Sequence, residues 1–302
     1  DFIRVAPDRF TFQTAFGERY IPFGAVYFNE RHPEIDAMDY WNHFDELQVA
    51  EDFALAERLG CNVLRLCFYG TREEGPKGVV IGTKEDEKKW RFLFKTAREH
   101  NLRLYVEPRI RGEFVQDSAH LAHYVSLYLK LGRLFKNEPA LFCWELDSEA
   151  VTLVGYPGDK ELWLEWLAQK YPSEEANAKA WDLEAKPGWR DGVWVKWTHA
   201  LHHNSAYDAI RGIEPTLWYL DSENRKDDQS LYDWQLFREW LYTHKLKQVA
   251  EALRSEDRNH LLSLDLVLWA FPLVRNPGAA GYGGPYGYSA INLTELAKFV
   301  DF

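Results

Sequence analysis

The chain has 302 residues, of which 46% are hydrophobic, and its 47 acidic and 36 basic residues give a net charge of −11. The hydrophobic share suffices for a large core and excludes intrinsic disorder, and the acidic balance argues against a nucleic-acid partner, because phosphate binding needs basic residues. No apolar run reaches the roughly 18 residues that a membrane-spanning helix needs, so no membrane partner is expected.

Short, continuously apolar runs recur along the chain, and turn residues bound each of them. Continuous rather than alternating hydrophobicity is typical of parallel strands that are covered on both faces. Helical patterns separate the runs, so strands and helices alternate. We expect six strands, at residues 22–28, 61–69, 102–108, 140–149, 260–266 and 299–302.

The segments between these strands carry helix signals. Glu46–Leu59 has apolar residues at helical spacing and is followed by a glycine, a natural stop. Thr83 and Asp86 resemble a capping box at the start of a second helix, with Asp in place of the usual Glu. A third helix is expected from about Ser118, and a long fourth one over about Leu231–Leu253.

With one exception, successive strands begin about 40 residues apart, as in a repeated strand–helix unit with right-handed crossovers. This spacing predicts an α/β fold, and the lack of a GxGxxG or phosphate-binding loop favours a (β/α)8 TIM barrel over a doubly wound sheet. A closed barrel needs eight strands. We therefore expect a barrel that is truncated in or after its sixth strand; the alternative hides two strands at Val193–Trp197 and Thr216–Leu220.

The one longer spacing lies between the fourth and fifth expected strands, which begin at residues 140 and 260. It predicts an insertion over residues 151–229 within a single barrel domain, residues 1–302. Barrel active sites lie at the C-terminal ends of the strands, so we expect an insertion subdomain on that face. A second long segment, Phe271–Ser289, is either a lid or an ordinary linker. The insertion and the start of the next helix hold nine of the thirteen tryptophans, Trp163, Trp166, Trp181, Trp189, Trp194, Trp197, Trp218, Trp234 and Trp240.

Aromatic residues are frequent, with 13 Trp, 16 Tyr and 18 Phe against one Met. They favour either a large aromatic core or a surface for flat, half-apolar ligands such as sugars. The cysteines Cys61, Cys67 and Cys143 lie in apolar stretches, so we expect buried free thiols rather than a disulfide framework.

The segment CWELDSE, residues 143–149, places three carboxylates at every second position toward the end of the fourth strand. If the strand stays regular, Glu145, Asp147 and Glu149 share one face. Buried carboxylates are costly unless they are paired or functional, and crowding raises the pKa of at least one of them, as a general acid requires. A salt-bridged strand end is the alternative.

This segment resembles the fourth-strand motif W-x-x-x-N-E of clan A glycoside hydrolases, which ends in the acid/base glutamate. PFGAVYFNE resembles their first strand, and LAERLGCNVLRL resembles the helix and second strand that end in an arginine near the nucleophile, here Arg65. Residues 161–181 and 231–240 resemble the region after strand four in family 42 β-galactosidases, and ELAKFVDF resembles the lead into strand six. The likeness is to family 42 β-galactosidase-like and family 5 cellulase-like proteins.

The resemblance implies a retaining O-glycosidase with Glu149 as the acid/base, in which a second carboxyl group about 5 Å away is the nucleophile. That nucleophile is a glutamate on strand seven, which is expected beyond Phe302; Asp265 is the only late substitute in the chain. Ser148 stands where the family has an asparagine that hydrogen-bonds the sugar 2-hydroxyl, and a serine offers one group in place of two.

Other candidate site residues follow from their positions at predicted strand ends. Arg65 and Glu107 either belong to the site or form a structural ion pair beneath it. Trp144 is expected in the core, because it lies five residues before the strand end. The candidate substrate-binding residues are Ser148, Arg65, Tyr27, Asn29, Tyr69, Glu107, Arg109 and Asp265.

The histidines do not suggest a metal site, because His120 and His123, and the group at residues 199–203, lack obvious further ligands. No metal and no cofactor are expected. We expect a retaining glycosidase for β-linked glycosides, β-galactosidase-like or an endo-β-glycanase, with a carbohydrate as its partner. A non-catalytic carbohydrate-binding barrel and a metal-dependent barrel hydrolase stay open, as do a homo-oligomeric state and the compartment of a soluble protein, cytoplasmic or secreted.

Overall fold

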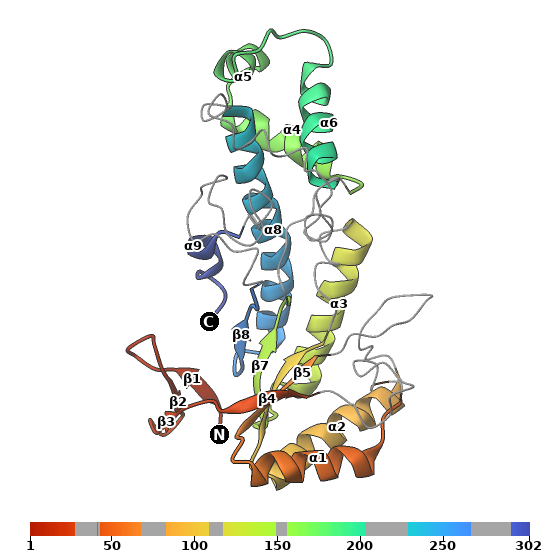
Figure 1. Ribbon diagram of the computed structural model, residues 1–302, viewed down its shortest axis with the longest axis vertical. Helices are drawn as coiled ribbons and strands as arrows, with labels where there is room; N and C mark the ends of the chain where they lie inside the picture. Colours follow the sequence, from red (N-terminus) through yellow and green to blue (C-terminus); the bar gives the residue numbers. More distant parts are fainter. Residues whose placement is uncertain are drawn as a thin grey trace, which may run out of the picture.

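The computed structural model describes residues 1–27, 41, 43–67, 83–108, 117–148, 156–202, 229–266 and 291–302. Its centre is a five-stranded parallel sheet in which neighbours in space are neighbours in the chain (Figure 1). This order is the one that a repeated strand–helix unit produces. The strands are β4 (Gly24–Tyr27), β5 (Val63–Cys67), β6 (Arg103–Glu107), β7 (Leu141–Glu145) and β8 (Leu261–Ser263).

The parallel α/β arrangement confirms the first five expected strands, each shorter than predicted. The prediction of a sixth strand at Phe299–Phe302 is wrong. Of these residues, only Asp301 forms hydrogen bonds with β8: its backbone N–H donates to the Leu262 carbonyl, and its carboxylate accepts from the Leu262 N–H. The hidden strand at Val193–Trp197 is also wrong, because these residues lie inside the helix α6 (Trp189–His202). Thr216–Leu220 and Phe271–Ser289 lie outside the described residues.

The sequence did not reveal a small antiparallel sheet at the N-terminus, formed by β1 (Ile3–Val5), β2 (Phe12–Thr14) and β3 (Arg19–Tyr20). Strands of two or three residues are too short to show a hydrophobic period. Ile3 and Phe12 of this sheet pack against the parallel sheet, where the rings of Phe12 and Phe142 meet edge to face at 5.3 Å. The small N-terminal sheet therefore covers part of the face of the parallel sheet that the helices leave open.

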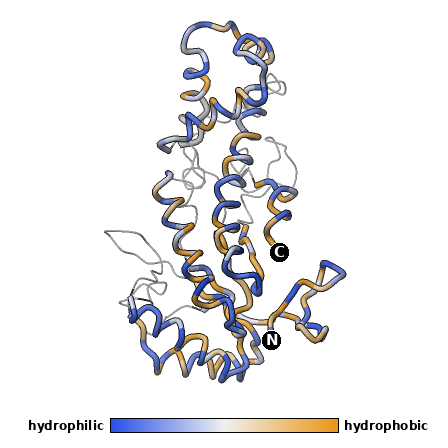
Figure 2. The backbone as a smooth tube through the Cα atoms, turned by 180° about the vertical axis from the view of Figure 1, so that it is seen from behind, coloured by the Kyte–Doolittle hydropathy of each residue, from blue (hydrophilic) through white to orange (hydrophobic). Residues whose placement is uncertain are grey.

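Four helices follow the strands, and all four were expected from the sequence. They are α1 (Glu46–Arg58), α2 (Lys84–Glu99), α3 (Ser118–Phe135) and α8 (Gln229–Glu256). The predicted capping box is confirmed, since Thr83 and Asp86 satisfy each other's backbone N–H groups. The helices alternate hydrophilic and hydrophobic residues along their length, as expected for helices with one buried side (Figure 2). Among the described helices, none is long and apolar enough to cross a membrane.

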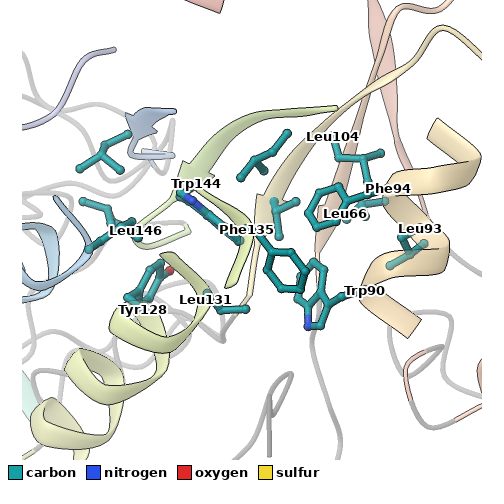
Figure 3. Packing of buried hydrophobic residues seen from close by; sticks show 14 of the residues in the cluster. Leu66, Trp90, Leu93, Phe94, Leu104, Tyr128, Leu131, Phe135, Trp144 and Leu146 are labelled. Carbon is teal, nitrogen blue, oxygen red and sulfur yellow. The ribbon is translucent and has the colours of Figure 1, made fainter. Parts of the chain in front are cut away.

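The main core lies between the sheet and these helices. Trp90 of α2 contacts Phe135 of α3 and Trp144 of β7, with ring centroids 5.9 and 6.3 Å apart (Figure 3). Leu64, Leu66, Leu104 and Val106 of β5 and β6 join the same core. Because side chains alternate across a strand, the residues between them, such as Arg65, face the other side of the sheet.

Beyond the sheet, the helices α4 (Asp159–Lys170), α5 (Glu174–Ala180) and α6 surround the first turns of α8 (Figure 1). They enclose a second hydrophobic cluster, in which the ring of Trp163 stacks on those of Trp166 and Trp181. The tryptophans of this region that the structure describes thus pack largely against one another, which supports the aromatic-core interpretation.

The buried carboxylate of Asp233 links α8 to α4 and to the end of α5. Asp233 of α8 accepts hydrogen bonds from Lys170 at 2.6 Å, from the Trp181 indole N–H at 2.9 Å and from Gln229 at 2.7 Å. It also accepts one from the Tyr171 hydroxyl. The carboxylate therefore joins α4, the end of α5 and α8.

Replacing Asp233 with Ala leaves these donors without their acceptor, so we expect Asp233→Ala to lower the free energy of unfolding by about 3 kcal/mol. Urea denaturation followed by tryptophan fluorescence measures this change. Asp191→Ala is the control, because Asp191 is exposed and forms a surface ion pair with the partly exposed Lys160. Its effect should stay within about 0.5 kcal/mol. Equal effects of the two variants would contradict the role of Asp233.

Candidate active site

The C-terminal ends of β5, β6, β7 and β8 bring polar side chains together on the sheet face opposite the main core. Arg65 lies in the middle of β5, and Glu107 and Glu145 are the last residues of β6 and β7. Parallel strands end at the same edge of a sheet, and polar side chains at their ends therefore converge. Ser148 and Asp265 join the group from the segments that follow β7 and β8.

Arg65 is the centre of this group, which we call the Arg65 cluster: Arg65, Glu107, Glu145, Ser148 and Asp265. Its Nε donates to Glu145 Oε2 at 2.8 Å, and its Nη2 lies 2.5 Å from Glu145 Oε1. The same Nη2 lies 2.9 Å from Ser148 Oγ and 3.0 Å from Asp265 Oδ2. The fork of the guanidinium thus matches one carboxylate with two bonds and reaches two further groups.

Glu145 is fully buried, and Arg65 compensates its charge. Burial raises the pKa of Glu145, while the hydrogen bonds and the charge of Arg65 oppose this rise. Sequence reasoning placed Glu145 in the acidic motif but did not identify it as the main partner of Arg65. The strand register contained the signal, because Arg65 pairs with Tyr105 and Tyr105 with Cys143, two residues before Glu145.

Glu107 is the least satisfied member of the cluster. Its side chain is 1% exposed, and among the described residues neither carboxylate oxygen has a hydrogen-bond partner. Arg65 Nη2 is 3.5 Å from Oε2, and Cys67 lies opposite Glu107 in the strand register. Burial, followed by the charge of Glu145, raises the pKa of Glu107 well above its usual range. Both effects favour the protonated form of Glu107.

Of the three carboxylates of the acidic motif, Glu145 and Asp147 lie in the described part of the chain, and they have different partners. The strand ends at Glu145 rather than at Glu149. Glu145 binds Arg65 of β5, whereas Asp147 accepts a hydrogen bond from the hydroxyl of Tyr242 of α8 at 2.9 Å. The motif therefore divides between the Arg65 cluster and the helix α8.

The remaining predicted residues lie elsewhere. Tyr27 is apart from the Arg65 cluster, because its hydroxyl donates to Asp52 of α1 at 3.0 Å. Trp144 is fully buried and donates to Asp257 at 2.9 Å, which confirms its place in the core. Cys67 and Cys143 are buried free thiols and Cys61 is half-buried. The predicted residues that lie outside the described ones are Glu149, Asn29, Tyr69 and Arg109.

In the described part of the chain, no group of three or more His, Cys, Asp or Glu side chains is arranged to hold a metal ion. His120 binds Asp117, the residue that caps the start of α3. The chemistry that the Arg65 cluster offers is therefore that of three carboxyl groups around one cation. Glu107 and Glu145 are buried and Asp265 is partly exposed.

The raised pKa of Glu107 predicts how stability depends on pH. Above the ordinary glutamate pKa of 4.5, the folded chain keeps a proton that the unfolded chain loses, so the free energy of unfolding falls as pH rises toward the raised pKa. The glutamine of the Glu107→Gln variant cannot ionise, so the stability of that variant lacks the pH-dependent contribution of residue 107. We expect the stability of the parent relative to Glu107→Gln to fall by up to about 1.4 kcal/mol per pH unit in this window.

Urea denaturation at pH 5, 7 and 9 measures this difference. Glu99→Gln, at an exposed residue of α2, is the control and should parallel the parent at every pH. Parallel curves for the parent and Glu107→Gln would show that Glu107 is ionised in the folded protein.

Comparison with solved structures shows which proteins share this fold. No protein-family model matches the sequence, and no curated protein is significantly similar to it. Among solved structures, the chain is similar to a β-galactosidase from Marinomonas ef1, with a TM-score of 0.52 and 15% identity over 81% of this chain and 37% of that one. A β-galactosidase from Halorubrum lacusprofundi gives a TM-score of 0.53 and 12% identity over 92% and 39% of the two chains.

An endo-1,4-β-mannanase from Rhizomucor miehei is also similar, with a TM-score of 0.52 and 14% identity over 100% of this chain and 70% of that one. The chain spans less than two fifths of the length of the two β-galactosidases. At these identities the likeness concerns the fold. It confirms that the chain has the fold of glycoside hydrolases, as its resemblance to clan A predicted.

Proposed function

We propose that the protein is a retaining O-glycosidase that hydrolyses β-linked glycosides, with Glu149 as its acid/base. The observation that carries this proposal is the Arg65 cluster at the C-terminal ends of the strands, where barrel enzymes have their active sites. Ser148, which directly precedes Glu149, is fixed in this cluster by Arg65. The fold shared with glycoside hydrolases supports the proposal.

The reaction needs two carboxyl groups. Glu149 gives its proton to the glycosidic oxygen that leaves, while a second carboxylate attacks the anomeric carbon and forms a glycosyl-enzyme. Glu149 then takes a proton from water, which attacks the same carbon and releases the sugar and the carboxylate. We assign the second carboxylate to a glutamate on a seventh strand beyond Phe302; Asp265 is the late substitute within the chain.

The proposal includes a (β/α)8 barrel that further strands complete, with residues 151–229 as an insertion subdomain on its C-terminal face. β4 supports this, because among the described strands it pairs with β5 alone, and its residues Gly24, Ala25 and Val26 are exposed. The length of the similar β-galactosidases agrees with it. In a closed barrel the first strand pairs with the eighth.

For the substrate we propose a β-galactoside first and an internal bond of a β-glycan second. The similar structures include β-galactosidases and an endo-1,4-β-mannanase, so both modes of action occur on this fold. The described tryptophans of the insertion lie largely in its own core, which gives less support to an extended aromatic cleft there.

A non-catalytic carbohydrate-binding protein is the second candidate. Ser148 favours it, because this residue is fully buried and bound to Arg65, with Asp265 Oδ2 at 3.5 Å. The hydroxyl therefore does not offer an exposed contact for the sugar 2-hydroxyl, in contrast to the role implied by the family's asparagine. For the metal-dependent alternative, the described residues offer no set of ligands.

Glu149→Gln in the natural polypeptide tests the proposal. The amide cannot protonate a leaving group, so we expect turnover of aryl β-galactosides to fall by about 10²–10⁴-fold. The loss should be smallest for a strongly acidic phenol, which leaves without help, and sugar binding should persist. Glu251→Gln, an exposed change on α8, is the control and should keep full turnover.

Each other outcome has its own meaning. Full turnover in Glu149→Gln would contradict its assignment as the acid/base. Sugar binding without turnover in the parent would favour the binding protein, and turnover that a chelator abolishes would favour the metal-dependent hydrolase.

A further inference from the structure

The members of the Arg65 cluster differ in how far they reach the surface. Glu107, Glu145 and Ser148 are buried, whereas the side chains of Arg65 and Asp265 are 20% and 38% exposed. These two are joined at 3.0 Å. A ligand that approaches this end of the described strands therefore meets Asp265 and Arg65 before any other part of the cluster.

Both residues keep hydrogen-bonding capacity. Arg65 uses Nε and Nη2, and Asp265 uses Oδ2, so Arg65 Nη1 and Asp265 Oδ1 make no hydrogen bond with a described residue. The backbone N–H of Asp265 donates to the Asp147 carbonyl at 3.1 Å, which fixes the start of this segment. The pair thus offers donors beside an acceptor, and two neighbouring hydroxyl groups of a sugar need that combination.

A buried group independently indicates that the cluster is incomplete by itself. Both oxygens of Glu107 lack a hydrogen-bond partner among the described residues, although the side chain lies only 3.5 Å from Arg65. Buried polar groups are almost always satisfied, and an unsatisfied one commonly marks a place where water or a ligand completes the contacts.

The charges of the cluster do not balance. The two short contacts with Glu145 already commit the single positive charge of Arg65. Asp265 adds a second carboxylate on the exposed side, so the cluster presents net negative charge even with Glu107 neutral. A carboxylate or sulfate on a ligand would lie against Asp265 and be repelled, whereas a hydroxyl or ammonium group would donate to it.

We propose, on the basis of the carbohydrate-binding site proposed above, that Asp265 and Arg65 are the sugar-contacting pair and that Asp265 selects ligands by charge. The site accepts neutral and amine-bearing sugars and rejects sugars that carry a carboxylate. Asp265 is then a specificity-determining residue, and the buried Glu145 and Ser148 hold Arg65 in place behind it.

Dissociation constants for galactose, galactosamine and galacturonic acid test this inference, measured by ligand-observed NMR titration at neutral pH. For the parent protein we expect galacturonate to bind at least about tenfold more weakly than galactose, and galactosamine at least as tightly as galactose. Because the effect is electrostatic, the difference should shrink with added salt. In Asp265→Asn the three constants should lie within about threefold of one another.

Two further variants complete the design. Asp265→Glu keeps the charge and should keep the order of the three ligands, which also covers the case in which Asp265→Asn does not fold. Glu18→Gln removes one negative charge from an exposed residue of the N-terminal sheet region and should leave the three constants unchanged.

The outcomes separate this inference from the proposed function. If sugars bind but Asp265→Asn keeps the order of the parent, or Asp265→Glu loses it, the charge selection is overturned and the glycosidase proposal stands. If none of the three sugars binds to the parent, the β-galactoside specificity and this inference both fail.

Discussion

One guanidinium holds the C-terminal end of the sheet together. Arg65 is the point at which β5, β7 and the segment after β8 meet, through Glu145, Ser148 and Asp265. An arginine is suited to this task because its fork binds one carboxylate with two bonds and still reaches other acceptors. Removing it would leave a buried carboxylate without its counter-charge, which is among the costliest changes to a folded protein.

The acidic groups of the cluster have different surroundings, which favour different charge states. Burial favours the protonated form of Glu107, while the bonds from Arg65 favour the ionised form of Glu145. Asp147 lies two residues after Glu145, but its carboxylate accepts a hydrogen bond from the hydroxyl of Tyr242 on the helix α8. The alternation of side chains across each strand makes this separation possible, because the apolar residues on the other face form the main core and leave this face for polar groups.

Much of the fold was predictable because it rests on strong local patterns. Continuous apolar runs gave five of the strands, and the capping residues Thr83 and Asp86 gave the start of α2. The three N-terminal strands were missed because they are too short to show a period, and Phe299–Phe302 was misassigned because an apolar run alone does not show whether a strand partner bonds to it. Of the site, position at strand ends selected Arg65, Glu107 and Asp265, and the resemblance to clan A selected Ser148. The structure brings these four residues together. The pairing of Arg65 with Glu145 depends on strand register, including a shift between β6 and β7, and the motif alone does not show it.

The mutual dependence of Arg65 and Glu145 is the central requirement of this site. A double-mutant cycle with Arg65→Met and Glu145→Gln, followed by urea denaturation, measures it directly. Arg65→Met should lower the free energy of unfolding by about 3 kcal/mol or more, because it leaves the buried Glu145 without its counter-charge. Glu145→Gln should lower it less, because Arg65 is partly exposed and keeps its contact with Asp265. The double variant should be at least about 1.5 kcal/mol more stable than the sum of the two single effects implies. Additive effects, within about 0.5 kcal/mol, would contradict the central place of this pair.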